Sequence, residues 1–134
     1  MKIEEFETVT RDLQKKKIPG TVKKVVTGML EKQAEKIVVL KLKGINDMTD
    51  YMVICHGNSG RQNGAIADEI RRKLKSEFRL KPFSIEGVRE SEWILIDYID
   101  FIIHIFSEES RSKYSLEKLW MDAKRYDFYI DQKS

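Results

Sequence analysis

The stretch "WILIDYIDFIIHIF", residues 93–106, is the part of the sequence that decides the fold. It is rich in Ile, Leu and Phe, but Asp97, Asp100 and His104 interrupt the apolar run. The pattern predicts a β-hairpin with a two-residue turn at Ile99-Asp100. Such a turn requires a positive φ, which isoleucine adopts poorly.

The two faces of this hairpin differ in character, because side chains alternate along a strand. One face gathers four isoleucines and nothing polar, which predicts core: Ile94, Ile96, Ile103 and Ile105. The opposite face, here called the mixed face, is formed by the cross-strand pairs Trp93–Phe106, Leu95–His104 and Asp97–Ile102, with Tyr98 at the turn. Its composition is typical of a protein-binding surface. The alternative is a second buried layer under a helix, with Asp97 and His104 hydrogen-bonded to each other or to a neighbouring loop.

Length and composition predict one soluble domain. The chain has 134 residues, 35% of them charged, and a net charge of +3. Residues 82–134 nevertheless carry more acidic than basic side chains, which suits a basic partner. The single Cys55 excludes a disulfide framework and fits a reducing cytoplasm. We expect neither a secretory signal nor a membrane span.

The remaining pattern predicts an α/β fold with a mixed sheet flanked by helices. The expected strands are 36–43, 51–55, 83–87 and the two hairpin strands. A helix over about 22–35 is expected to be N-capped by Thr21. A second helix follows Ser59, which with Gln62 has the spacing of a capping box. The helix after Ser59 is expected to bury Ile66, Ile70, Leu74 and Phe78. The last helix, between Ser110 and Lys124, is expected to bury Leu116, Leu119, Trp120 and Ala123.

The expected organisation is an N-terminal extension over 1–20, one domain over 21–124 and a C-terminal tail over 125–134. The extension contains Lys15–Lys17, which indicates a solvated arm because no aromatic residues accompany the lysines.

No catalytic or metal-binding set is predicted. His56 and His104 are the only histidines, and with Cys55 they make a poor zinc site. The turn "GNSG", residues 57–60, lies between a strand and a helix, where backbone N–H groups could hold a phosphate. It resembles the Gly-Ser start of nucleotidyltransferases, but the strand that should supply two carboxylates offers only Glu86. We therefore predict neither a cofactor nor an enzymatic reaction.

Four blocks occur in a recognisable order: "TDYMVICHGNSGRQ" (49–62), "IEG" (85–87), the hairpin, and "ESRSKYSLEKLW" (109–120). Together they resemble the ribosomal silencing factor family, also called Iojap or RsfS, over about residues 22–123. The resemblance implies a nucleotidyltransferase-like fold that lacks its catalytic carboxylates. It also implies a cytoplasmic protein that is not an enzyme.

The family resemblance further implies a partner. Family members bind the universal large-subunit ribosomal protein numbered fourteen, block the joining of the ribosomal subunits and repress translation when nutrients are scarce. They are often dimers. A contact between Lys15–Lys17 and ribosomal RNA stays an open alternative. The family contacts fall on Trp93, Asp97, Tyr98 and Phe106. With the mixed face, they give the predicted partner-binding set Trp93, Leu95, Asp97, Tyr98, Asp100, His104 and Phe106.

Two positions depart from the family pattern. Ile99 stands where the family usually has Gly in "DYGD", and Lys41 stands where Asp is common.

The sequence leaves two other functions open. One is a nucleotide-binding or nucleotidyl-transferring protein that uses the Gly57–Ser59 turn, and the other is a dimeric adaptor that self-associates through the mixed face.

Overall fold

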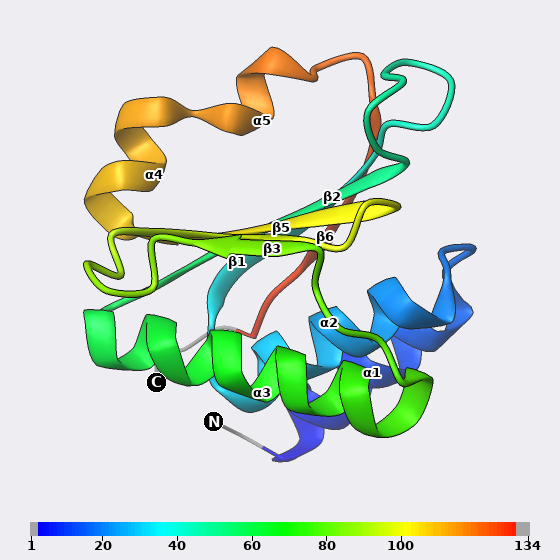
Figure 1. Ribbon diagram of the computed structural model, residues 1–134. Helices are drawn as coiled ribbons and strands as arrows, with labels where there is room; N and C mark the ends of the chain where they lie inside the picture. Colours follow the sequence, from blue (N-terminus) through cyan, green and yellow to red (C-terminus); the bar gives the residue numbers. More distant parts are fainter. Residues whose placement is uncertain (1–2, 131–134) are drawn as a thin grey trace.

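The computed structural model describes residues 3–130 and places one β-sheet between two layers of helices (Figure 1). The helices are α1 (Ile3–Lys15), α2 (Gly20–Glu31), α3 (Gly60–Phe78), α4 (Glu108–Tyr114) and α5 (Leu116–Leu119). Helices α1, α2 and α3 lie on one side of the sheet, and α4 and α5 lie on the other. None of the helices in the described range is long and apolar enough to cross a membrane.

The sheet is mixed, as predicted, and it has six strands where the sequence predicted five. Its strands are β1 (Glu35–Lys41), β2 (Tyr51–Gly57), β3 (Ser84–Glu86), β4 (Trp93–Asp97), β5 (Phe101–Ser107) and β6 (Lys124–Phe128). They lie in the order β3-β4-β5-β2-β1-β6. The central pair β2–β5 is parallel and the other neighbours are antiparallel. The predicted α/β class is therefore confirmed.

The hairpin has the register predicted from the sequence. Trp93 pairs with Phe106, Leu95 with His104 and Asp97 with Ile102. The four isoleucines of the other face are all 0% exposed. They lie on the side of α2 and α3, where the larger of two buried clusters contains them together with Val25, Met29, Ile66, Ile70 and Leu74.

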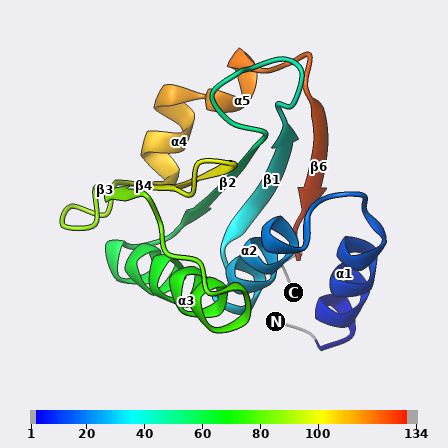
Figure 2. The ribbon, with the colours of Figure 1, turned by 45° about the vertical axis from the view of Figure 1, so that its right-hand side comes forward.

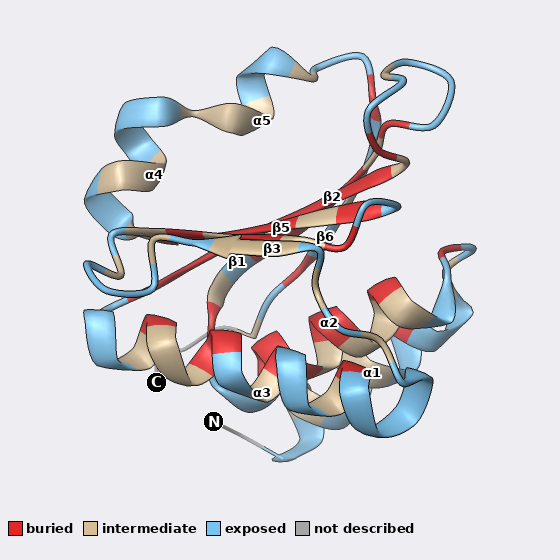
Figure 3. Cartoon of the chain, in the orientation of Figure 1, coloured by how far each residue is buried: buried red, intermediate tan, exposed pale blue. Residues whose placement is uncertain are grey.

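Burial is unequal on the two sides of the sheet (Figure 3). The side covered by α1, α2 and α3 holds the larger cluster. The side covered by α4 and α5 holds a small cluster formed by Val38, Leu40, Leu42, Met52, Ile54, Phe106 and Ala123. Trp93, Leu116 and Trp120 pack against this small cluster and are only partly buried.

Both ends of the described chain are more ordered than the sequence indicates. Residues 3–15 form α1, and its Leu13 is completely buried in the larger cluster. Near the C-terminus, β6 pairs with β1 over Ile37–Lys41 and buries Phe128 (Figure 2). The sequence predicted neither a packed helix nor a strand here, because each is stabilised by tertiary contacts rather than by its own pattern.

Some local predictions were confirmed and others were wrong. Ser59 caps α3, since its Oγ accepts a hydrogen bond from the Gln62 N–H at 3.1 Å. Thr21 is not a cap, because α2 already begins at Gly20 and its N-cap position is Pro19.

Two side chains that we expected to be buried are exposed: Phe78 by 39% and Leu119 by 69%. The predicted last helix is broken at Ser115, whose φ is +45°. The break changes the direction of the chain and turns Leu119 outward.

Candidate protein-binding face

Trp93 lies at the centre of the contacts between the mixed face and α4. Its ring centroid is 5.0 Å from that of Phe106 and 4.7 Å from that of Tyr114. Its indole N–H donates to His104 Nδ1 at 2.9 Å. The indole is thus held by two ring contacts and one hydrogen bond while the residue stays partly exposed, an arrangement in which Trp can anchor a protein interface.

His104 is a buried support for Trp93 and does not reach solvent. It is 5% exposed, and burial lowers its pKa to about 4. Because Nδ1 accepts the indole hydrogen bond, the neutral imidazole carries its proton on Nε2. It makes no hydrogen bond to Asp97, which we had considered for a buried layer.

The accessible part of the mixed face is a short apolar strip. Leu95 and Ile102 are half-buried and belong to neither buried cluster. On β3, Glu86 pairs with Leu95, lies on the same face and is exposed. The strip therefore has an acidic border that begins at the edge of the sheet.

The hairpin turn extends this acidic border. Asp97 Oδ1 accepts a hydrogen bond from the Ile99 N–H at 2.7 Å, and Asp100 is exposed. The Asp100 N–H donates to the Tyr98 carbonyl at 2.9 Å, which closes a γ-turn around Ile99. Ile99 has a φ of +73°, so the residue that departs from the family pattern occupies a conformation suited to glycine.

Besides His104, two residues of the predicted set offer a partner little surface. Tyr98 lies on the opposite side of the sheet, 8% exposed in the larger cluster and stacked on Phe101, so its expected place beside the mixed face is wrong. The reason is that the γ-turn bends the chain only after Tyr98, so Tyr98 continues the alternation of β4 and lies on the same face as Ile94 and Ile96. Burial raises the pKa of its phenol. Phe106 is on the expected face but is 1% exposed under α4.

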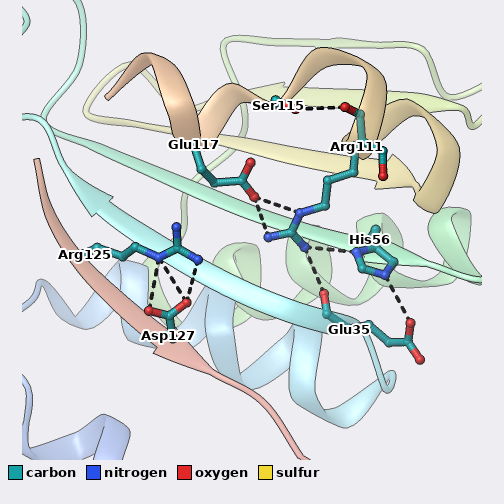
Figure 4. A network of polar contacts seen from close by, with 8 residues as sticks. Glu35, His56, Arg111, Ser115, Glu117, Arg125 and Asp127 are labelled. Atoms are coloured by element: carbon teal, nitrogen blue, oxygen red, sulfur yellow. Dashed lines mark hydrogen bonds and ion pairs between the residues drawn. The ribbon is translucent and has the colours of Figure 1, made fainter. Parts of the chain in front are cut away.

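A polar network holds the α4–α5 segment against the sheet beside the mixed face (Figure 4). Arg111 of α4 donates through Nε to Glu117 at 2.8 Å and through Nη1 to His56 Nδ1 at 3.0 Å. The other ring nitrogen of His56 is 3.1 Å from the carboxylate of Glu35 on β1. One arginine thus joins the broken helix to two strands.

The network keeps His56 neutral and Glu117 charged. Burial first, and then the charge of Arg111, lower the pKa of His56, although Glu35 opposes the change. Burial alone would raise the pKa of Glu117, but its backbone N–H and Arg111 outweigh burial and lower the pKa. His56 is therefore a hydrogen-bonded residue of this network.

Comparison with known proteins shows the family. The family described as "Ribosomal silencing factor during starvation" matches residues 15–134. The chain belongs to this family. The ribosomal silencing factor of Bacillus subtilis is 44% identical over 93 residues, which cover 69% of this chain and 78% of that protein.

Two further relatives agree. The ribosomal silencing factor of Halalkalibacterium halodurans is 42% identical over 98 residues, which cover 73% of this chain and 83% of that protein. A crystal structure of a Bacillus halodurans protein superposes with a TM-score of 0.65 at 39% identity, covering 74% of this chain and 91% of that one. The mixed face and the broken α4–α5 segment both lie inside the range that the family matches.

In this family member, the side chains of Gln62 and Asn63 lie against the "GNSG" turn, residues 57–60, where a phosphate could otherwise bind. Gln62 Oε1 accepts from the Asn58 N–H at 2.6 Å, and its Nε2 donates to the carbonyls of Lys32 and Gln33. A Cβ built on Gly57 would lie 2.3 Å from Asn63 Oδ1. Two carbonyl-type oxygens therefore face the turn where a phosphate would need donors, which disfavours an anion there.

The described part of the structure also gives no support to a reactive cysteine or a metal site. Cys55 is completely buried in the larger cluster, and burial raises the pKa of its thiol to about 12. Within residues 3–130, no group of three or more His, Cys, Asp or Glu side chains is arranged to hold a metal ion. Sequence reasoning missed Tyr114, Glu86 and Arg111 as parts of the site, although all three lie in or next to the quoted family blocks.

Proposed function

We propose that this family member silences the ribosome by binding the universal large-subunit ribosomal protein numbered fourteen through its mixed face. The bound protein would block the joining of the subunits by steric occlusion, and translation would be repressed. This action needs no substrate, cofactor or turnover. It also places the protein in the cytoplasm, where ribosomal subunits join.

The observation that supports the proposal is the half-buried strip of Leu95 and Ile102 with its acidic border. Apolar side chains at the centre and polar ones at the rim are the usual anatomy of a protein interface. Trp93 would supply the aromatic anchor at one end of the strip. At the other end, Asp97 and Asp100 would meet basic side chains, contributing orientation and association rate more than affinity.

The test is co-sedimentation of the full chain with isolated large subunits. Leu95→Arg places a charge in the strip without removing a core contact, and we expect it to abolish co-sedimentation. Tyr129→Arg is the matched control, because Tyr129 is 63% exposed beyond β6, at the opposite edge of the sheet. If Leu95→Arg sediments with subunits as the wild type does, the mixed face is not the binding surface.

Trp93→Ala and Asp97→Lys do not separate binding from folding. Trp93→Ala would remove two ring contacts and the partner of His104, and Asp97→Lys would remove the acceptor for the Ile99 N–H. Both therefore change the fold as well as the surface. Asp100→Lys is the cleaner charge reversal, since Asp100 is exposed, and we expect slower association with subunits at low salt.

Self-association is the competing use of the same strip. A homodimer formed through Leu95 and Ile102 would hide the surface that the ribosomal protein needs. Light scattering of the wild type and of Leu95→Arg distinguishes the two uses. If Leu95→Arg loses ribosome binding but remains a dimer, the proposal is supported. The dimer interface then lies outside the strip.

A further inference from the structure

A basic groove lies on the side of the molecule away from the mixed face, between α3 and the segment that leads into β3. Its volume is about 620 Å³. Four cationic side chains and a single carboxylate, Asp68, are among the residues that line it. The cations are Arg71, Arg72, Lys75 and Lys81.

Three of the four cations are available to a ligand. Arg72 pairs with Glu69 one turn earlier on α3. Arg71, Lys75 and Lys81 are exposed, and none of them forms an ion pair with another described residue. Arg71 and Lys75 are one helical turn apart, about 6 Å along the axis. The groove therefore presents a row of positive charges with little internal compensation.

The groove is shaped by the way α3 ends. Arg79 has a φ of +55°, and the N–H groups of Arg79 and Leu80 donate back to Lys75 and Leu74, each at 3.1 Å. This Schellman turn reverses the chain, so that residues 80–83 return alongside α3. Lys81 is thereby placed across the groove from the cations of the helix.

An exposed aromatic ring stands in the same groove. Phe83 lines it and is 74% exposed, while its backbone N–H donates to the Asp97 carbonyl at 2.7 Å. The backbone of Phe83 is therefore held by β4, while its exposed ring belongs to neither buried cluster. An exposed aromatic ring beside a row of cations is the combination that binds single-stranded nucleic acid, with the ring stacking on a base and the cations contacting phosphates.

We propose that this groove binds single-stranded RNA, with Arg71, Lys75 and Lys81 on the phosphates and Phe83 stacked on a base. An acidic peptide would use the cations but not the ring. It would also find only a three-residue strand, β3, for backbone pairing at this edge. The inference does not depend on the mixed face binding a ribosomal protein, and it can be tested without ribosomes.

The test is fluorescence anisotropy of the full chain with a labelled single-stranded RNA of about 12 nucleotides, repeated over a range of salt. We expect binding at low salt. The double variant Arg71→Gln/Lys75→Gln should weaken it and reduce the slope of log K against log salt by about 1.4, or about 0.7 per lost contact. The matched control Lys113→Gln/Lys118→Gln removes the same charge from exposed positions on α4 and α5 and should leave the slope nearly unchanged.

The aromatic contribution is tested separately. Phe83→Ala should weaken RNA binding by about fivefold or more, and Phe83→Tyr should restore it. The proposal is overturned by no binding at low salt, or by equal losses in the groove and control variants, which would indicate diffuse charge attraction. It is also overturned if labelled polyglutamate binds as tightly as RNA and Phe83→Ala changes neither, since the groove would then bind acidic peptides.

Discussion

The two sides of the sheet differ in how much apolar surface they bury. On the side of α1, α2 and α3, apolar residues of β1, β2, β4 and β5 are buried, and the hairpin contributes four isoleucines that are completely buried. On the side of α4 and α5, apolar burial is confined to a small cluster, and a polar network lies beside it. The first side supplies stability, and the second leaves a strip of the sheet accessible.

The largest effect is expected on the helix-covered side. Ile103→Ala removes a completely buried side chain and should lower the free energy of unfolding by about 2–5 kcal/mol. On the mixed face of the same hairpin, Leu95→Ala should cost less than about 1 kcal/mol, because Leu95 is only half-buried. Urea unfolding of both variants measures the difference. Equal losses would show that the strip is core.

The next effect is a dependence of stability on pH from His104. Its pKa is lowered from 6.5 to about 4, so the unfolded chain takes up a proton at a higher pH than the folded one. Stability should be constant above pH 6.5 and fall by about 3 kcal/mol as the pH decreases toward 4. His104→Gln keeps an acceptor for the indole but does not titrate, and its stability should fall less steeply over this range. An unchanged pH profile would contradict the assignment.

A smaller effect is expected at the polar network. Arg111→Leu leaves Glu117 and His56 without their partner, and we expect a loss of about 2 kcal/mol, since Arg111 and Glu117 are 11% and 16% exposed. The matched control is Arg125→Leu, because Arg125 and Asp127 form a pair that is 48% exposed on each side and is worth less than about 1 kcal/mol. Urea unfolding with limited proteolysis shows whether α4 and α5 detach first. Similar losses in both variants would mean that Arg111 does not hold the segment.

The smallest effect is expected at the hairpin turn. Ile99→Gly removes a non-glycine residue from a φ of +73° and should stabilise the protein by up to about 1 kcal/mol. Ile45→Gly serves as the control, because Ile45 is similarly exposed in a loop but is not among the residues with positive φ. Thermal unfolding compares the two. Destabilisation by both changes would show that Ile99 is not strained.

The hairpin could be predicted in detail because its strand pairing depends on residues that are close together in the sequence. The turn position and the period of two determine which residues pair, and Ser59 caps α3 through a contact within one helical turn. The parts that were missed depend on distant partners. In the sequence, Leu13 lies in a charged segment that gives no sign of packing, and residues 125–134 are expected to be a tail. In the structure, Leu13 is buried in the larger cluster and β6 pairs with β1.

The site was predicted only partly for the same reason. Alternation assigned Trp93, Leu95, Asp97, His104 and Phe106 to one face, and the structure has them there. Alternation cannot tell which of them a separate helix covers, so the burial of His104 and Phe106 emerged only with α4 in place. Arg111 lies 55 residues from His56 in the chain, and no local pattern connects them.

The position of β6 has a consequence for the synthesis of this protein. The strand that completes the sheet is made last, and until Lys124–Phe128 has left the ribosome the outer edge of β1 has no neighbour. That edge belongs to the apolar run "IVVL", residues 37–40. Open apolar edges are templates for pairing between chains. A nascent or truncated chain that ends before Lys124 would therefore be prone to aggregate, although its hairpin is already complete.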